Sequence, residues 1–264
     1  MVICAALGLA SQSEVHRSRM KYSTLSKTPG DGFDRIQWYD AKLNTHTIRA
    51  DDPITALTVA PGERTRKPGK WKGQKPYQGH YWCAGSRTSV FHESMTEYAG
   101  MMLIDHLYDI VEVHAQPMLM TFFDGRFCYP DFLAIEASGT RHVIEVHPKA
   151  LMKPEDEVKF AHAARVCEVL GWRFTLIDQL SDIVRMNLEM MSRYRHHRYT
   201  PAPAVEEHIL RTAKTNESFG AVHRALVTDK PGELTPFLFN LMWRRELTFD
   251  LTRAFTEHTP LALA

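Results

Sequence analysis

The stretch RFCYPDFLAIEASGTRHVIEVHPK, residues 126–149, decides the fold class of this 264-residue chain. It contains two short apolar runs rich in β-branched and aromatic residues, separated by the turn-like pair Ser138-Gly139. Both runs are typical of buried strands. Asp131 stands at the start of the first run and Glu145 at the end of the second. The pattern therefore delivers two carboxylates to the same end of adjacent strands.

This pair of carboxylates predicts a site for a hard divalent cation. Mg²⁺ prefers oxygen ligands and is commonly held by one or two carboxylates together with phosphate oxygens. Such an ion lowers the pKa of a bound water and clamps a phosphodiester. The stretch therefore indicates a metal-dependent nuclease. The alternatives are ordinary surface roles, namely a turn aspartate after Pro130 and a strand-end glutamate in an ion pair.

Length and composition bound the other possibilities. An apolar fraction of 44% excludes bulk disorder, and 264 residues favour two domains over one. The net charge of +1 identifies no class of partner. The cysteines are scattered without metal-ligand spacing, which indicates reduced thiols in a cytoplasmic protein: Cys4, Cys83, Cys128 and Cys167. No apolar run is long enough to span a bilayer, so we expect no membrane association.

Composition and residue pattern divide the chain into three parts: an irregular, basic N-terminal arm over 1–88, a central domain over 89–200 and a C-terminal domain over 201–264. In the central part, periodicity predicts a helix beginning at Ser94, short strands near 111–113 and 118–123, the two strands of residues 126–146, a helix from Pro154 and a strand near 172–177. The order of helix, three strands, helix and strand predicts an α/β layer on a mixed sheet.

The last part follows a linker-like Pro-Ala segment at 200–204. Three short helical patterns near 205–214, 218–227 and 233–244 precede a small hairpin, which is typical of a winged-helix domain. The alternative is a helical domain that binds other proteins. Because the helices are not strongly basic, protein contact is favoured over base readout.

Two segments of concentrated positive charge predict contact with DNA phosphates. Residues 61–82 interleave aromatic rings with cations, and cations neutralise phosphates while rings stack on bases. A solvated basic linker is the alternative. The predicted phosphate contacts are Arg64, Arg66, Lys67, Lys70, Lys72, Lys75, Arg193, Arg195 and Arg198.

Several short motifs resemble a known family in their order and spacing. They are Glu93-Ser94-x-x-Glu97, Gln116-Pro117, Tyr129-Pro130-Asp131-Phe132-Leu133, Val143-Ile144-Glu145-Val146 and the ending Leu241-Met242-Trp243-Arg244-Arg245-Glu246-Leu247 with Asp250-Leu251. Over roughly residues 80–260 the chain resembles PD-(D/E)xK nucleases, and more narrowly the TnsA-like endonuclease subunits of heteromeric transposases. The resemblance implies a restriction-endonuclease-like mixed-sheet core (αβββαβ) followed by a small helical, winged-helix-like domain.

The resemblance also implies a function and roles for residues. It implies a DNA endonuclease, dependent on Mg²⁺ or Mn²⁺, that cuts double-stranded DNA at transposon ends beside a DDE-type transposase subunit and an AAA+ ATPase regulator. Asp131 and Glu145 are then metal ligands, joined by the backbone carbonyl of Val146. Glu97 reaches the site from the first helix as a further metal-binding residue and orients a metal-bound water, with Glu93 as its competitor.

One position departs from the family pattern, which has a lysine two residues after the second acid. This chain has His147 there, and Lys149 follows two residues later. A lysine stabilises developing negative charge as a permanent cation, whereas a histidine is only partly charged at neutral pH. The options are cleavage assisted by His147, a lysine displaced to position 149, or an inactive nuclease fold that serves as an assembly subunit. A restriction or phage-type endonuclease is a further alternative, and we expect an active enzyme.

Overall fold

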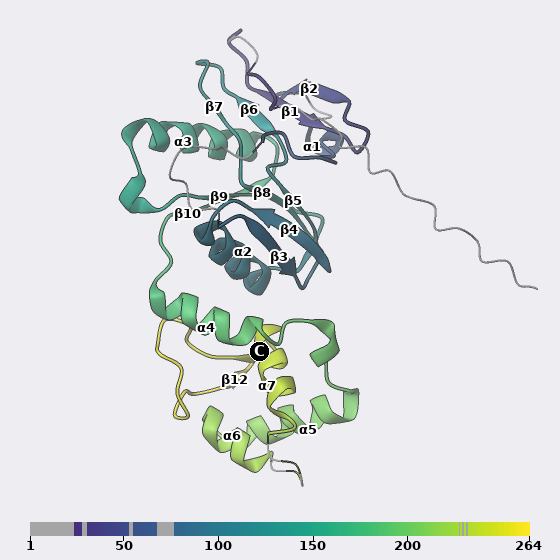
Figure 1. Ribbon diagram of the computed structural model, residues 1–264, viewed down its shortest axis with the longest axis vertical. Helices are drawn as coiled ribbons and strands as arrows, with labels where there is room; N and C mark the ends of the chain where they lie inside the picture. Colours follow the sequence, from purple (N-terminus) through teal and green to yellow (C-terminus); the bar gives the residue numbers. More distant parts are fainter. Residues whose placement is uncertain are drawn as a thin grey trace, which may run out of the picture.

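The structure of the protein is a computed structural model that describes residues 24–27, 31–52, 55–67, 77–226, 228, 230 and 232–264. It is a mixed α/β fold with antiparallel and mixed sheets, which confirms the predicted fold class at this level (Figure 1). None of the described helices is long and apolar enough to cross a membrane.

A four-stranded sheet forms the centre of the upper half of the molecule in Figure 1. Its strands, in spatial order, are β10 (Arg173–Ile177), β9 (Arg141–Val146), β8 (Phe132–Glu136) and β5 (Ile110–Ala115). β8 pairs antiparallel with β5 and β9, whereas β9 and β10 are parallel. Parallel neighbours need a crossover connection, and here helix α3 (Pro154–Val169) provides it.

Alternation of side chains along β9 separates two hydrophobic cores. Ile144 and Val146 pack with the buried residues of helix α2 (Met95–Leu107), whereas Val143 packs with those of α3. Successive side chains of a strand point to opposite faces of the sheet. Glu145 therefore belongs to the face covered by α3.

A second sheet packs against the α3 side of the central sheet. Its order is β2 (Thr45–Arg49), β1 (Arg35–Tyr39), β6 (Leu119–Thr121) and β7 (Phe127–Cys128), all antiparallel. The β6–β7 hairpin, predicted next to the central strands, instead pairs with an N-terminal strand. Ile36 of β1 and Met120 of β6 are fully buried in the same core as α3, and this shared burial accounts for the pairing.

The described part of residues 1–88 is therefore not irregular, contrary to the prediction. Besides β1 and β2 it contains α1 (Thr55–Thr58), β3 (Gly79–Cys83) and the start of β4 (Thr88–His92), which pairs with β3. The strands were missed because they are short and because β2 contains no fully buried residue, so that it lacks a strong apolar pattern.

Asp105 of α2 fixes the β3–β4 hairpin onto the helix. Its carboxylate is only 5% exposed and accepts hydrogen bonds from Tyr81 Oη (2.8 Å), Cys83 Sγ (3.2 Å), Ala84 N (2.8 Å) and Gly85 N (3.1 Å). A buried carboxylate is tolerated only with such partners. Asp105 is therefore a structural acid.

The C-terminal third consists of helices and one small antiparallel pair of strands. The elements are α4 (Asp182–Ser192), α5 (Pro203–Lys214), α6 (Phe219–Ala225), α7 (Thr235–Trp243), β11 (Leu247–Thr248) and β12 (Ala262–Leu263). Single 3₁₀ turns span Lys149–Leu151 and His197–Tyr199. The last six residues of α7 are all buried.

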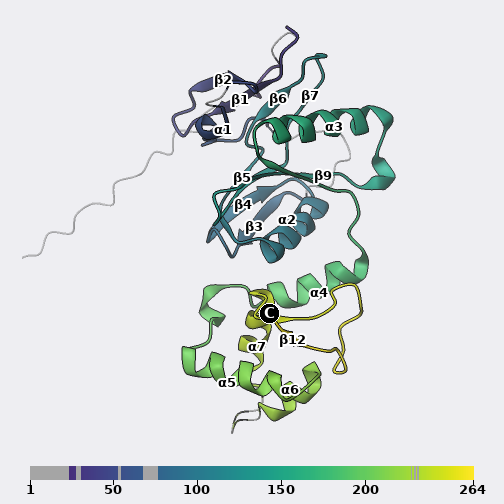
Figure 2. The ribbon, with the colours of Figure 1, turned by 180° about the vertical axis from the view of Figure 1, so that it is seen from behind.

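The C-terminal helices pack directly below α2 (Figure 2). Buried side chains of α2, α4 and α7 form one continuous core. At its edge, His106 Nδ1 lies 3.1 Å from the carbonyl oxygen of Trp243. Burial lowers the pKa of His106 to about 4, so the ring is neutral at physiological pH and donates this bond through Nδ1–H.

Candidate functional site

The register of β8 and β9 brings Asp131 and Glu145 together. Phe132 pairs with Ile144 in an antiparallel ladder, so Asp131, one residue earlier, stands opposite Glu145, one residue later. Residues directly opposite in such a ladder share a face, with Cβ atoms about 4.5–5.5 Å apart. Asp131 Oδ2 also accepts a hydrogen bond of 2.8 Å from the backbone N–H of Val146, which fixes its orientation.

Burial makes this pair of carboxyl groups electrostatically costly. Asp131 is 7% exposed, and burial raises its pKa well above the usual range, with the charges of Glu145 and Glu97 adding to the effect. Burial also raises the pKa of Glu145 to about 7, while the cations Lys159 and Arg66 act in the opposite direction. A cation that binds between the two carboxylates would remove this cost.

Glu97 borders the site from the first turn of α2. Ser94, the N-cap, accepts a hydrogen bond from Glu97 N (3.1 Å), and the Glu97 carboxylate accepts one from Glu93 N (2.7 Å). Both bonds satisfy free donors at the start of the helix, as in a capping box. Burial raises the pKa of Glu97 too. Glu97 therefore caps the helix while its charge acts on both strand carboxylates.

Glu93 holds two further polar residues beside the carboxylates. Its carboxylate pairs with Arg66 Nη2 at 2.9 Å and accepts a bond of 2.6 Å from Gln116 Nε2. Gln116 N in turn donates to the backbone oxygen of Asp131 at 2.7 Å. Glu93 is thus a supporting residue, and Arg66, which was predicted to contact phosphates, is an ion-pair partner at the edge of the site.

The N-terminal segment is tied to the site through Gln116. The backbone oxygen of Gln116 accepts bonds from Thr65 N and Thr65 Oγ1, each at 2.9 Å. Gln116 has a positive φ of 47°, which only a few per cent of non-glycine residues adopt. This contact places Arg66 next to Glu93, and its charge offsets part of the rise in the pKa values of Glu97, Asp131 and Glu145.

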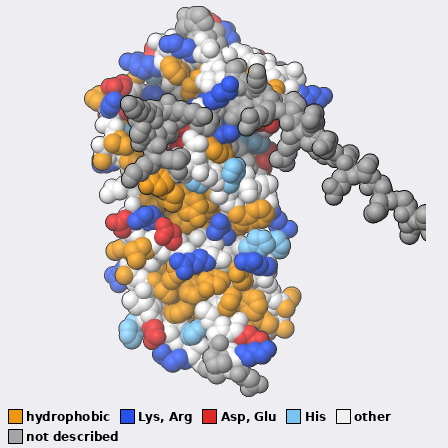
Figure 3. Space-filling model, viewed as in Figure 1, with side chains coloured by type: hydrophobic (Ala, Val, Ile, Leu, Met, Phe, Trp, Pro, Cys, Tyr) orange, Lys and Arg blue, Asp and Glu red, His pale blue; other side chains and the backbone are white. Residues whose placement is uncertain are grey.

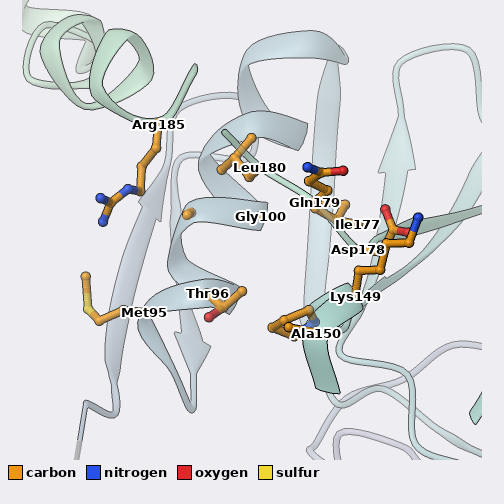
Figure 4. A pocket seen from close by; sticks show the side chains of 12 residues that line it. Met95, Thr96, Gly100, Lys149, Ala150, Ile177, Asp178, Gln179, Leu180 and Arg185 are labelled. Atoms are coloured by element: carbon orange, nitrogen blue, oxygen red, sulfur yellow. The ribbon is translucent and has the colours of Figure 1, made fainter. Parts of the chain in front are cut away.

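The structure separates the two residues predicted to replace the family lysine. His147 packs against Phe160 of α3, with the rings tilted by 59° and their centroids 5.4 Å apart, and its Nε2 lies 3.6 Å from Asp156 Oδ2. Lys149 is in the 3₁₀ turn beyond β9 and lines a pocket of about 600 Å³ together with Gly100 and Ile177 (Figure 4). That pocket lies on the α2 side of the sheet, because Gly100 adjoins the side chain of Val146.

Sequence reasoning missed Lys159 of α3, the cation with the largest influence on Glu145. The signal was present in the helical period. The apolar stripe of α3 comprises Phe160, Ala163, Val166 and Cys167. One turn towards the N-terminus, the same stripe continues through Asp156 and Lys159. The stripe faces the sheet, and so it carries Lys159 to the side on which Glu145 lies.

The predicted phosphate contacts of the N-terminal arm are only partly described. Lys70, Lys72 and Lys75 lie outside the described residues. Arg64 places its guanidinium 3.9 Å from the centroid of the Phe91 ring. Lys67 is exposed.

The basic residues after α4 are also in different environments. Arg193 and Arg198 are exposed, whereas Arg195 donates from Nε to the Trp82 carbonyl at 2.8 Å and so joins the segment to β3. On the face seen in Figure 3, Lys and Arg side chains form a band between two hydrophobic areas, at the level of α4.

Neutralising exposed cations is expected to flatten the salt dependence of DNA binding. Each phosphate contact contributes about 0.9 to the slope of log K against log salt concentration. The triple variant Lys67→Ala, Arg193→Ala, Arg198→Ala should lower this slope by about 3 if all three touch phosphates. Fluorescence anisotropy over a salt series measures the slope. Lys214→Ala, at the exposed end of α5, serves as the control, and an unchanged slope in the triple variant would leave these residues as solvated surface charges.

The donor set fits a hard divalent cation that is completed by other oxygen ligands. Within the described residues, no three His, Cys, Asp or Glu side chains form a complete ligand cluster. Asp131 and Glu145 nevertheless supply the one or two carboxylates with which Mg²⁺ is commonly held beside phosphate oxygens and waters. Gln116 Oε1, next to this pair, is buried and has no hydrogen-bond partner within the described part of the chain. A water bound to such an ion would satisfy it.

No protein-family model matches the chain, and no curated protein matches it significantly. The function of the site has to be inferred from its own chemistry. The chemistry is that of a buried carboxylate, Asp131, opposite a half-buried one, Glu145, with charges of Glu97, Arg66 and Lys159 acting on them.

The raised pKa of Glu145 predicts a specific dependence of stability on pH. Its folded pKa of about 7 exceeds the ordinary value of 4.5, so in the metal-free protein the contribution of Glu145 to stability is fully present below pH 4.5 and is lost as pH rises towards 7. We expect Glu145→Gln to match the wild type near pH 4.5 and to exceed it at pH 8 by up to about 3 kcal/mol, less where water reaches the carboxylate.

Urea unfolding in EDTA at several pH values measures this difference. Glu168→Gln, at an exposed position of α3, is the matched control. If the difference in free energy of unfolding between the wild type and Glu145→Gln stays constant from pH 4.5 to 8, the Glu145 carboxyl group titrates alike in the folded and unfolded chains, and the prediction is wrong.

Proposed function

We propose that this protein is a DNA endonuclease subunit of the TnsA-like kind, dependent on Mg²⁺ or Mn²⁺, that cleaves DNA at transposon ends. The observation that carries the proposal is the opposed pair of Asp131, just before β8, and Glu145, near the end of β9, whose raised pKa values a bound cation would relieve. The order α2, β5, β8, β9, α3, β10 in one mixed sheet supports a restriction-endonuclease-like core.

Each residue of the site then has a distinct task. Asp131 and Glu145 would hold the ion, with the backbone carbonyl of Val146 as an additional candidate ligand. The ion supplies activation of a water molecule and stabilisation of charge on the phosphodiester. The N–H of Val146 keeps the Asp131 carboxylate oriented, and Glu97, fixed by the helix cap, contributes negative charge at the border of the site.

The C-terminal helices favour contact with proteins rather than with bases. In a winged-helix domain that reads DNA, the recognition helix offers exposed side chains to the major groove. The corresponding helix here, α7, contains no charged residue and is buried from Leu238 to Trp243. We therefore propose that the region serves in assembly, with the DDE-type transposase and AAA+ ATPase that the resemblance implies as its partners.

A catalytically inactive assembly subunit is the second candidate function. The observation that favours it is the absence of a lysine two residues after Glu145, where His147 turns towards Asp156 instead. Both functions require the same fold and the same partners, and only chemistry at the carboxylate pair distinguishes them.

The deciding experiment is cleavage of plasmid DNA that carries the ends of the cognate element. The full chain is incubated with the purified transposase and ATPase subunits, in Mg²⁺, Mn²⁺ or EDTA. Strand breaks at the ends that need both the divalent ion and this protein would support the endonuclease. Complex formation on DNA without these breaks would support the assembly subunit.

A further inference from the structure

Helix α3 brings a permanent positive charge to the face of the sheet that carries Glu145. Its buried stripe packs in the same core as Val143, and Glu145 follows Val143 by two residues on the same face of β9. Lys159 precedes Ala163 of that stripe by one turn, so its side chain leaves the helix on the side of the sheet.

The contacts of Lys159 hold its ammonium group in place. Nζ forms an ion pair of 2.8 Å with Asp156 Oδ1 and lies 4.4 Å from the centroid of the Phe160 ring. The side chain is 25% exposed, so it is packed along most of its length. His147 approaches the other oxygen of Asp156 at 3.6 Å, which places Asp156 between the histidine and the lysine.

The two other candidates for this charge are less well placed. Lys149 begins a 3₁₀ turn, and its own backbone N–H donates a hydrogen bond of 2.8 Å to the Asp178 carbonyl. Lys149 also lines the pocket on the opposite side of the sheet (Figure 4). His147 is on the correct side, but its ring packs on Phe160 and faces Asp156. A histidine is also only partly charged at neutral pH.

We propose that Lys159 is a catalytic residue that takes the place of the lysine which the resembled nucleases carry two residues after the second acid. This inference rests on the proposed endonuclease function and adds to it the residue that assists hydrolysis. In the reaction, the oxygen of a water forms a bond to phosphorus, one bond from phosphorus to a sugar oxygen breaks, and the leaving oxygen gains a proton. Lys159 keeps its own proton throughout and stabilises the negative charge that develops on the phosphate oxygens.

Asp156 then acts as a positioning residue for this cation. Its carboxylate holds Nζ from the first turn of α3, where negative charge is favoured by the helix dipole. His147, just beyond β9, lies next to Asp156 without a hydrogen bond to it.

The test compares Lys159→Met and Lys159→Arg with Lys153→Met, an exposed lysine that precedes the same helix. Under single-turnover conditions with partner subunits, Lys159→Met should lose roughly 10²–10³-fold in cleavage rate, as expected for removal of one group that stabilises transition-state charge. Lys159→Arg should recover a large part of this loss, and Lys153→Met should cleave like the wild type.

Binding of Mn²⁺ provides a second measurement that does not depend on cleavage. Removing a fixed positive charge beside the carboxylates should tighten Mn²⁺ binding several-fold by isothermal titration calorimetry, because the ion no longer approaches a like charge. Tighter metal binding combined with slower cleavage distinguishes an acting cation from a variant that has merely misfolded, since misfolding weakens both.

The possible failures are distinguishable. Absence of cleavage by the wild type would overturn the proposed endonuclease. Wild-type cleavage that Lys159→Met leaves unchanged, or a larger loss in Lys149→Met than in Lys159→Met, would overturn only the assignment of Lys159. Unchanged Mn²⁺ affinity in Lys159→Met would also overturn it, because the charge would then lie away from the site.

Discussion

Replacement of Asp131 by asparagine is expected to reduce the rate of DNA cleavage by roughly 10³-fold or more, well beyond the roughly 10–100-fold cost of losing a group that only supports a metal ligand. The asparagine side chain still offers an oxygen to the Val146 N–H, so the local backbone is retained. It removes a negative charge that is buried opposite Glu145. Without divalent metal, the variant should therefore be at least as stable as the wild type at pH 7.

Three measurements on Asp131→Asn separate chemistry from folding: single-turnover cleavage, Mn²⁺ titration and urea unfolding. Asp124→Asn, in the exposed turn of the β6–β7 hairpin, is the matched control, because it changes the same functional group near by in the sequence. If Asp131→Asn cleaves within tenfold of the wild type, the metal is bound elsewhere, and the role of Asp131 is wrong although the chain still cleaves DNA.

The largest effect on stability is expected from Asp105→Ala, which should lower the free energy of unfolding by about 3–5 kcal/mol. The substitution leaves four donors of the β3–β4 hairpin without their acceptor, and two of them, Tyr81 Oη and Cys83 Sγ, belong to fully buried residues. Each unpaired buried donor costs about 1–3 kcal/mol, although water entering the gap offsets part of the sum. Asp105→Asn retains one acceptor oxygen and should lose less.

The control for this prediction is Asp109→Ala, four residues further along the chain. Asp109 is 76% exposed and pairs with Arg245, and an exposed ion pair contributes less than about 1 kcal/mol. Urea unfolding followed by circular dichroism compares the two variants. A loss below 1 kcal/mol in Asp105→Ala would show that the hairpin is held by its apolar contacts alone.

Local patterns predicted the elements of the central sheet well. The capping residue Ser94 marks the true start of α2, and the two apolar runs of residues 126–149 became β8 and β9. The opposition of Asp131 and Glu145 follows from the short turn at Ser138-Gly139, because a tight turn fixes the register of an antiparallel pair.

Contacts between distant segments account for what was missed. The pairing of β6 with β1 joins residues more than 80 positions apart, and nothing in either strand alone specifies the partner. The place of Arg66 beside Glu93 depends on the path of the N-terminal segment past Gln116. The position of Lys159 depends on which face of α3 packs on the sheet. That face is indicated only when the apolar and charged residues of the helix are considered together.

Helix α2 joins the two halves of the molecule as a rigid rod. Glu97 stands in its first turn and His106 in its last, about 14 Å apart along the axis at 1.5 Å per residue. At the far end, the neutral His106 ring is bonded to Trp243, and this link persists at any pH well above 4. Because α2 shares a core with α4 and α7, a displacement of the C-terminal helices is expected to shift α2, and with it Glu97 at the border of the carboxylate pair.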